Sequence, residues 1–357
     1  MPILFSPLQL RSLTLPNRII VSPMCQYSSE DGMPNEWHFV HLGSRAVGGA
    51  AMVFVEASGV TPEGRITPWD AGIWSQAHAK AWAPIARFLR EHGAIPAIQL
   101  AHAGRKASCT KPWLGGKALA PGDGAWETLG PSPIPHGSYP PPRSMTIDEI
   151  ERTVDDFRRA ALHSLAAGFD VVEVHGAHGY LIHNFLSPLS NQRTDPYGGS
   201  LENRMRFPLA VGDAVRRAWP ADKPVFYRIS ASDWAEGGWD LAQSIEFSRR
   251  LKAIGIDLVD CSSGGNVDYQ KIKLEPGYQV PFAAAIRKEA QIPTIAVGLI
   301  SEPAQAEEIV ASGKADAVML ARAFLRDPYW PRNAAKALGL DPAWPDQYKR
   351  AEVVLPR

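Results

Sequence analysis

The stretch TIDEIERTVDDFRRAALHSLAAGFDVVEVH, residues 146–175, decides the fold. Thr146 followed three residues later by Glu149 is the pattern of a capping box, which marks the start of a helix. Gly168 is a typical helix stop, because glycine readily adopts the left-handed conformation that ends many helices. The valine-rich run Val171–His175 that follows is typical of a buried parallel strand. The stretch therefore predicts a helix, a tight turn and a strand in succession.

The same order of elements recurs along the whole chain. Amphipathic segments that end at a glycine predict further helices at His78–His92, Leu241–Ile254 and Pro303–Ser312. Short runs rich in β-branched or aromatic residues alternate with them, which indicates βα units around a parallel sheet. Because eight parallel strands close a barrel, we expect an α/β fold, a single (β/α)₈ barrel over residues 1–340. The expected strands are Arg18–Ser22, Ala51–Ala57, Ile95–Leu100, Val171–His175, Val225–Ser230, Leu258–Ser262, Thr294–Val297 and Ala317–Leu320.

Two segments depart from the repeated unit. Leu8–Leu10 and Leu13–Leu15 predict a small N-terminal hairpin that closes the barrel floor. Residues 101–143, after the third strand, are rich in proline and glycine and longer than an ordinary connection. We expect them to form part of the active-site rim, with a disordered insertion as the alternative. Trp113 and Trp126 favour the ordered loop, because they give it apolar surface to bury.

The charge balance points to a small-molecule partner. Lys plus Arg and Asp plus Glu both number 37, and no long run of like charge indicates a nucleic-acid groove or an anionic membrane surface. No apolar stretch reaches the roughly 18 to 20 residues of a membrane span, and prolines and arginines interrupt the N-terminal segment. We expect a cytoplasmic protein. Cys25, Cys109 and Cys261 are too scattered for a disulfide framework or a zinc site, so reduced thiols are expected.

Reactive side chains follow several expected strands. In a (β/α)₈ barrel the active site lies at the C-terminal ends of the strands, so these side chains are expected to converge. They are Ser22 to Tyr27 after the first strand, Gln99 in the third, His175, His178 and Tyr180 after the fourth, Arg228 in the fifth, and Ala321 and Arg322 after the eighth.

At these positions the chain resembles a known family. The segments SPMCQY (22–27), QLAHAGRKA (99–107), HGAHGYLIHNFLSPLSNQRTDPYGGSLENR (175–204) and LARAFLRDP (320–328) are similar to the old yellow enzyme family of NADH:flavin oxidoreductases, specifically its bacterial thermophilic-like ene-reductase subclass. The resemblance extends over nearly the whole chain. It implies tightly bound FMN in the barrel of residues 1–340, and NADPH or NADH as co-substrate.

The resemblance also implies a cofactor site. A fixed cation, Arg228, would stabilise the negative charge that develops when the flavin is reduced. Gln99 would bond the pyrimidine edge of the ring, and Arg322 would supply a fork for the phosphate. Cys25 would lie beside the ring, although a small buried thiol is the plainer interpretation. The full implied set is Ser22, Pro23, Met24, Cys25, Ala57, Gln99, Arg228, Gly298, Ala321 and Arg322.

For the substrate, the resemblance implies four residues near the end of the first and fourth strands. The spacing of His175 and His178 alone favours metal ligation or plain packing, but the family pair that they resemble donates hydrogen bonds to a substrate carbonyl oxygen. Tyr180 is similar to the family's proton donor, and Tyr27 to a tyrosine that binds the substrate. Lys106 either shapes the pocket or is a solvated lysine.

The C-terminal tail, residues 341–357, carries a further similarity. Its segment DQYKR (346–350) resembles a stretch of the subclass in which the arginine reaches a neighbouring subunit's active site. Arg350 would then bind substrate in a homodimer or homotetramer. The alternative is a frayed terminus with an exposed charge.

The implied activity is the reduction of the C=C bond of α,β-unsaturated carbonyl compounds, with maleimides, nitro compounds and quinones as further substrates, in a ping-pong cycle of hydride transfer. A metal-dependent hydrolase using His175, His178, His183 and Asp195 is an alternative from another class. A catalytically silent barrel that serves as a flavin-binding or ligand-binding scaffold is a second alternative. The related 2,4-dienoyl-CoA reductases need clustered cysteines and a longer chain than this one.

Overall fold

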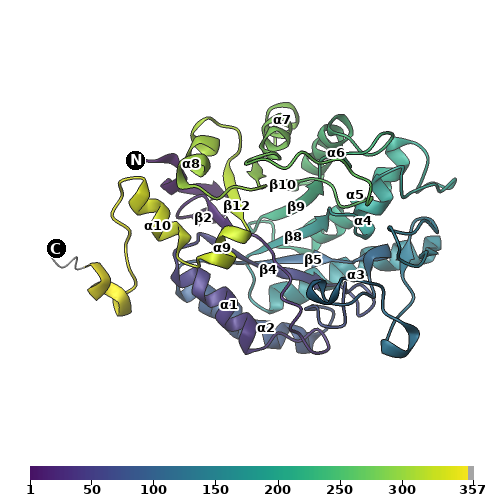
Figure 1. Ribbon diagram of the computed structural model, residues 1–357, viewed down its shortest axis with the longest axis horizontal. Coiled ribbons are helices and arrows are strands. Elements are labelled where there is room, and N and C mark those ends of the chain that lie inside the picture. Colours follow the sequence, from purple (N-terminus) through teal and green to yellow (C-terminus); the bar gives the residue numbers. More distant parts are fainter. Residues whose placement is uncertain (353–357) are drawn as a thin grey trace.

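Eight parallel strands close into a barrel in the computed structural model, which describes residues 1–352 (Figure 1). The strands are hydrogen-bonded to one another in chain order, and the last of them pairs with the first. The predicted (β/α)₈ barrel is confirmed, and every expected run coincides with a strand to within a few residues. The strands are β3 (Ile19–Val21), β4 (Met52–Gly59), β5 (Ile95–Ala101), β8 (Val171–Gly176), β9 (Val225–Ser230), β10 (Leu258–Ser262), β11 (Thr294–Ala296) and β12 (Ala317–Leu320).

Helices cover the outside of the barrel and begin and end where local chemistry requires (Figure 1). The Thr146 side chain accepts a hydrogen bond from Glu149 N, and the Glu149 side chain accepts one from Thr146 N, so the predicted capping box is present. Gly168 has φ 89°, the left-handed conformation expected of a helix stop. The helices are α1 (Glu36–Val47), α2 (Gln76–Glu91), α3 (Ile147–Ala166), α4 (Leu181–Leu186), α5 (Leu201–Ala218), α6 (Leu241–Ala253), α7 (Val280–Ala290), α8 (Pro303–Ala311), α9 (Arg322–Arg326) and α10 (Trp330–Ala337).

The interior of the barrel has an apolar floor and a polar upper layer. Successive side chains of a strand point to opposite faces, so alternate residues face the barrel axis. Val171 and Phe226 belong to an apolar cluster that fills the floor, separate from the larger cluster between strands and helices. Two residues further along the same strands stand Glu173 and Arg228, both buried. The strand register therefore places charged groups directly above an apolar floor, at the C-terminal ends of the strands.

The N-terminal hairpin is confirmed. β1 (Leu8–Leu10) pairs antiparallel with β2 (Leu13–Leu15). Leu10 and Leu15 belong to the apolar cluster inside the barrel, so the hairpin closes the floor from below.

The long loop after β5 is folded against the barrel. It contains the short 3₁₀ turns η2 (Gly104–Lys106), η3 (Pro112–Leu114) and η4 (Pro121–Asp123), and the short strands β6 (Leu129–Gly130) and β7 (Arg143–Ser144). Trp126 is partly buried and its indole N–H donates to Glu63 O at 2.9 Å. Trp113 remains 65% exposed, so the expectation that it is buried is wrong. Its ring instead meets the ring of Tyr27 edge-on, with centroids 5.6 Å apart.

The chain leaves the barrel after α10. The tail extends to one side of the barrel and ends in the 3₁₀ helix η5 (Asp346–Glu352), while the rings of Trp344 and Tyr348 lie 6.3 and 6.4 Å from that of Tyr329 (Figure 1). Arg350 lies on this outlying segment and is exposed. Among residues 1–352, no helix is long and apolar enough to cross a membrane.

Candidate active site

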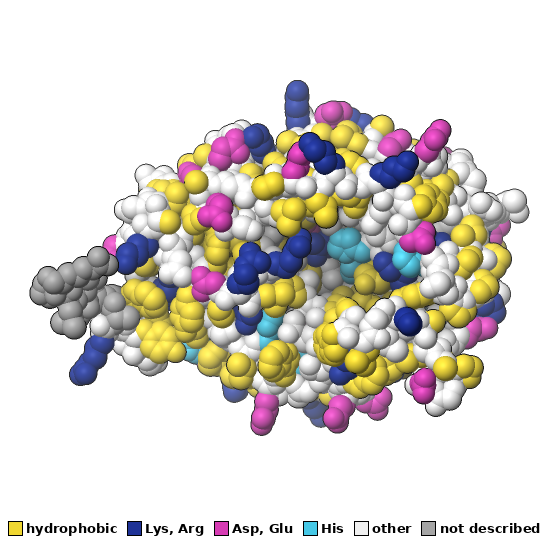
Figure 2. Space-filling view, viewed as in Figure 1, with side chains coloured by type: hydrophobic (Ala, Val, Ile, Leu, Met, Phe, Trp, Pro, Cys, Tyr) yellow, Lys and Arg dark blue, Asp and Glu magenta, His cyan; other side chains and the backbone are white. Residues whose placement is uncertain are grey.

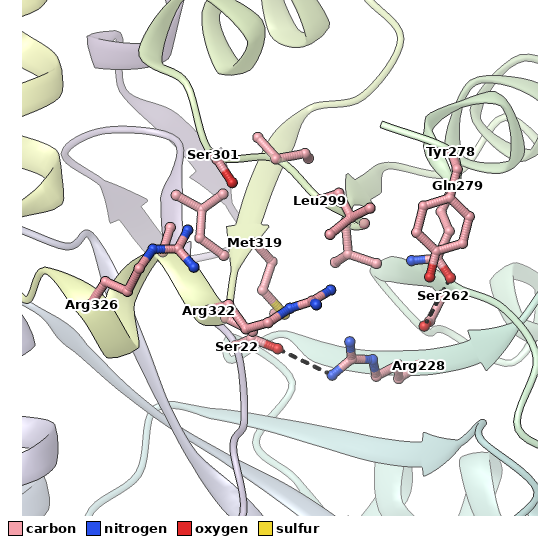
Figure 3. Close-up of a pocket in the computed structure, with 16 residues that line it drawn as sticks. Ser22, Arg228, Ser262, Tyr278, Gln279, Leu299, Ser301, Met319, Arg322 and Arg326 are labelled. Carbon is pink, nitrogen blue, oxygen red and sulfur yellow. Dashed lines mark hydrogen bonds between the residues drawn. The ribbon is translucent and has the colours of Figure 1, made fainter. Parts of the chain in front are cut away.

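A cavity opens at the C-terminal ends of the strands, next to β11 and β12. Its volume is about 230 Å³, and Figure 3 shows arginine side chains around it. Gly298 has φ 106°, and a Cβ there would meet the Gln279 side chain at 2.8 Å, so the turn at this wall needs glycine. The lining includes Ser22, Arg228, Ser262, Tyr278, Gln279, Gly298, Ala321, Arg322 and Arg326.

Beneath this cavity the upper layer of the barrel forms a buried charged network. Arg228 Nε lies 2.9 Å from Asp260 Oδ2, and Arg228 Nη1 lies 3.3 Å from Ser22 Oγ. Gln99 Nε2 donates to Glu173 Oε1 at 2.8 Å. Burial, with the neighbouring carboxylate, raises the pKa of Glu173 to about 8, against the opposing effect of Arg228. Glu173 therefore holds a proton at neutral pH and leaves Arg228 and Asp260 as a one-to-one ion pair.

Three aromatic side chains meet after β8. The ring of His175 lies 5.1 Å from that of His178 and 5.1 Å from that of Tyr180, centroid to centroid. Burial, followed by the charge of Arg228, lowers the pKa of both histidines well below the ordinary value, so both imidazoles are neutral at pH 7. Burial raises the pKa of Tyr180 well above 10, so its phenol stays protonated. The trio thus offers neutral hydrogen-bond donors and one weakly acidic proton.

The backbone between these side chains forms an unusual turn. His178 has φ 60° and Gly179 φ 71°, so two successive residues are left-handed. A Cβ at Gly179 would come within 2.1 Å of Gly265 O, which leaves room for glycine alone. Side chains from surrounding elements bond every polar backbone atom of this pair. His178 N donates to Ser230 Oγ (2.9 Å) and Gly179 N to His183 Nδ1 (2.9 Å), while His178 O accepts from Lys106 Nζ (2.9 Å) and Gly179 O from Asn184 Nδ2 (2.9 Å).

His183 lies behind this turn and holds it through the hydrogen bond from Gly179 N. His183 Nε2 lies 3.0 Å from Asp233 Oδ1, and both side chains are fully buried. Because His183 Nδ1 accepts the Gly179 N–H, its proton is on Nε2, facing the carboxylate. Asp195 is paired with Arg193 at 2.5 Å. Within residues 1–352 no three His, Cys, Asp or Glu side chains come together as a metal site, so the hydrolase alternative has no ligand set there.

The segment after β3 lies close to two buried carboxyl groups. Burial, then the charges of Asp70 and Glu56, raises the pKa of Cys25 well above its ordinary value, so the thiol stays protonated and is a poor nucleophile. Tyr27 has φ 51°, a strained conformation for a tyrosine. Glu56 Oε2 accepts a hydrogen bond from Gln26 N at 2.6 Å and so fixes the turn between these two side chains.

Comparison with known proteins identifies the family. Residues 3–341 match the model of the NADH:flavin oxidoreductase / NADH oxidase family. The chain belongs to this family, that of the old yellow enzymes. It is 50% identical over 351 residues to an NADPH dehydrogenase of Geobacillus thermodenitrificans, covering 98% of each chain.

Solved structures of the old yellow enzyme family have the same fold. Morphinone reductase in complex with tetrahydroNAD is 29% identical, with a TM-score of 0.78 over 96% of this chain and 93% of that one. The old yellow enzyme homologue from Zymomonas mobilis is 27% identical, with a TM-score of 0.77 over 99% of this chain and 100% of that one.

The residues of the cavity fit the flavin that the family implies. The guanidinium groups of Arg322 and Arg326 beside a glycine turn suit an anionic phosphate. The cavity continues past Gln279 to Arg228, so one wall carries groups for a polyol chain and a polar ring edge. His175 Nδ1 is buried without a hydrogen-bond partner, which indicates a donor or acceptor kept for a bound molecule.

The structure gathers most of the residues expected from the sequence. Arg350 does not approach the cavity of its own chain, since it lies on the outlying tail (Figure 1). Figure 2 shows that histidine and basic side chains gather where this face of the molecule is hollowed. Ser22, Arg228, Gly298, Ala321 and Arg322 line the cavity, Ala57 pairs in register with Gln99, and Pro23, Met24, Cys25 and Tyr27 follow β3.

Sequence reasoning missed two buried carboxyl groups and four of the cavity residues named above. Glu173 and Asp260 occupy the polar inward position in the runs VVEVH and LVDCS, and that alternation was a signal for them. Ser262 ends β10 in the same alternation. Tyr278 and Gln279 lie on the connection before α7, and Arg326 is the last residue of the short helix α9, so no strand periodicity marks them.

Proposed function

We propose that this protein is an FMN-dependent ene-reductase of the thermophilic-like subclass. It would use NADPH or NADH to reduce the C=C bond of α,β-unsaturated carbonyl compounds in a ping-pong cycle, and would accept maleimides, nitro compounds and quinones as related substrates. The observation that carries the proposal is the cluster of His175, His178 and Tyr180, in which two neutral imidazoles adjoin a protonated phenol. The NADPH dehydrogenase among its relatives and the tetrahydroNAD complex of morphinone reductase support the nicotinamide co-substrate.

The cofactor proposal assigns each wall of the cavity. FMN, when bound, supplies hydride transfer between the nicotinamide and the substrate. Arg322, with the turns at Gly298 and Ala321, would hold the phosphate. Arg228 would face the pyrimidine end of the ring as a fixed cation, kept in place by Asp260. The remaining proposed contacts are Ser22, Pro23, Met24, Cys25, Ala57 and Gln99.

The substrate proposal follows from the protonation states. His175 and His178 would each donate a hydrogen bond to the carbonyl oxygen, which makes the β-carbon electrophilic without requiring a charged imidazole. Tyr180 would give its proton to the α-carbon as hydride reaches the β-carbon. Tyr27 would bind the substrate from the loop after β3.

The tail proposal concerns assembly. Residues 1–340 would be the FMN-binding barrel, and residues 341–357 would lie at a subunit interface of a homodimer or homotetramer. The exposed position of Arg350 on a segment that leaves the barrel supports this role, since its side chain is available to a second copy (Figure 1). Arg350 would then bind substrate in the neighbouring active site.

Visible absorption of the purified protein tests the proposal. Under anaerobic conditions, the flavin bands should bleach on addition of NADPH and return on addition of 2-cyclohexen-1-one. A colourless protein that takes up no FMN would show the proposal to be wrong.

A further inference from the structure

Lys106 has no part in the function proposed above, yet it lies beside the residues that do. It ends η2, directly after β5, and is partly buried. Its Nζ donates to His178 O at 2.9 Å and to Gly265 O at 3.0 Å. The same Nζ lies 5.2 Å from the centroid of the Tyr180 ring. One ammonium group therefore joins the loops after β5, β8 and β10 and faces the phenol.

We propose that Lys106 is a positioning residue for Tyr180, and that its charge stabilises the phenolate formed when Tyr180 protonates the substrate. The proposal rests on the proposed function. In that step the O–H bond of Tyr180 breaks and a C–H bond forms at the substrate α-carbon. The electron pair of the O–H bond stays on the phenolate oxygen, and a solvent proton restores the phenol afterwards.

The surroundings of Tyr180 otherwise oppose this step. Burial is the largest cause of its raised pKa, and the nearby Cys25, Tyr27 and Asp70 act in the same direction. A cation against the ring stabilises the anionic form more than the neutral form. Lys106 also fixes the carbonyl of His178, which precedes Tyr180 by two residues, so one side chain supplies both the charge and the geometry.

The ammonium of Lys106 should itself titrate near the working pH. Burial, then the charge of Arg105, lowers its pKa to about 8, while Cys109 acts in the opposite direction. The other titratable groups that feel its charge are His136, His175 and His178, all with lowered pKa values and therefore neutral. As pH rises through about 8, the lysine becomes neutral and the stabilisation of the phenolate is lost.

Stopped-flow spectroscopy of the FMN-loaded protein separates the two half-reactions. In K106M the rate of re-oxidation by 2-cyclohexen-1-one should fall by about tenfold to a hundredfold, because only this half-reaction takes a proton from Tyr180. The saturating rate of bleaching by NADPH should change by less than about threefold. K106R, which keeps the charge but does not titrate near pH 8, is the matched control and should lose the alkaline decline of the re-oxidation rate.

The re-oxidation rate of the double variant K106M/Y180F distinguishes a lysine that acts through Tyr180 from one with a purely structural role. If Lys106 acts through Tyr180, K106M should have little further effect in the Y180F background. Additive losses in the double variant, an unchanged re-oxidation rate in K106M, or an equal slowing of both half-reactions would each overturn the proposal. If K106M fails to retain FMN, the pH profiles of the wild type and K106R decide, since matching alkaline declines would exclude titration of Lys106 as the cause.

The behaviour of the wild type distinguishes failure of the proposed function from failure of the proposed role of Lys106. A wild-type protein that NADPH does not bleach would overturn the proposed function, and the role of Lys106 with it. A wild type that completes both half-reactions beside a K106M variant of equal rate would overturn the role of Lys106 alone.

Discussion

The floor and the upper layer of the barrel interior are built from the same strands, yet the floor is apolar and the upper layer is charged. On β9, Phe226 belongs to the apolar floor, and Arg228, two residues later, belongs to the charged network under the cavity. On β8 the same spacing separates Val171 from Glu173. One step of the strand alternation therefore divides a packed region, which stabilises the barrel, from a region whose buried charges are held ready for a ligand.

This difference shows how a stable barrel can hold a site whose buried charges lower its stability. Buried charges destabilise a protein unless they are paired, and the upper layer holds two carboxyl groups against one arginine. The proton on Glu173 removes the excess negative charge. The apolar floor beneath contributes the packing that offsets the remaining cost.

The largest expected effect comes from breaking the upper layer at Arg228. R228M should leave Asp260 as an unpaired buried carboxylate and lower the free energy of unfolding by about 3–5 kcal/mol. It should also weaken FMN retention, because the fixed cation is lost. Chemical denaturation and the flavin absorbance of the purified variant measure the two effects. A stable R228M that keeps FMN would contradict the division into layers.

A matched change two residues earlier tests the floor. F226A should lower the free energy of unfolding by a similar amount, about 3–5 kcal/mol, because it opens a cavity among packed side chains. FMN-loaded F226A that remains folded should still bleach with NADPH at a rate within about threefold of the wild type. Loss of bleaching in folded F226A would mean that the floor also shapes the site.

A third change alters function with little effect on stability. Y180F should slow re-oxidation by the enone by about a hundredfold, because the proton donor is lost. Thermal unfolding should stay close to that of the wild type.

Tyr227 offers the control on the outer face of β9. Its hydroxyl donates to Pro208 O at 3.0 Å, so Y227F should cost about 0.5–1.5 kcal/mol of stability and leave the re-oxidation rate unchanged. Equal rates in Y180F and the wild type would remove Tyr180 from the proposed mechanism.

Much of this arrangement follows from the sequence for a simple reason. The barrel was predictable because capping boxes, helix-stopping glycines and alternating strands are local signals, as at Thr146 and Gly168. The side chains at strand ends were predictable because parallel strands bring their C-terminal ends to one edge. Family resemblance then supplied roles for His175, His178 and Tyr180 that spacing alone left open.

The rest depends on contacts between distant segments. The exposure of Trp113 is set by how a long loop meets Tyr27, for which no periodicity exists. The hydrogen bonds from Lys106 to two carbonyl oxygens require loops after three different strands. Glu173 shows a middle case, because its inward position was visible in VVEVH, but its protonation depends on Asp260, nearly ninety residues later in the chain.

The most selective expected effect, because it appears only as pH changes, comes from Glu173. Its pKa in the folded state, about 8, lies above the ordinary value, so between about pH 4 and pH 8 the folded state holds a proton that the unfolded state has released. Its contribution to stability is therefore fully present below about pH 4 and is lost as pH rises through about 8. E173Q, which does not titrate, should match the wild type near pH 4 and gain in relative melting temperature as pH rises to about 8, above which the difference should stay constant. The stability contribution of Glu149 should depend on pH in the opposite direction, because the hydrogen bond with Arg143 lowers its pKa to about 2. This contribution is present above about pH 4 and is lost as pH falls through about 2, so E149Q should be less stable than the wild type near neutral pH and approach it on acidification. A difference between wild type and E173Q that stays constant with pH would mean that Glu173 is ionised in the folded barrel, and that Arg228 balances two negative charges.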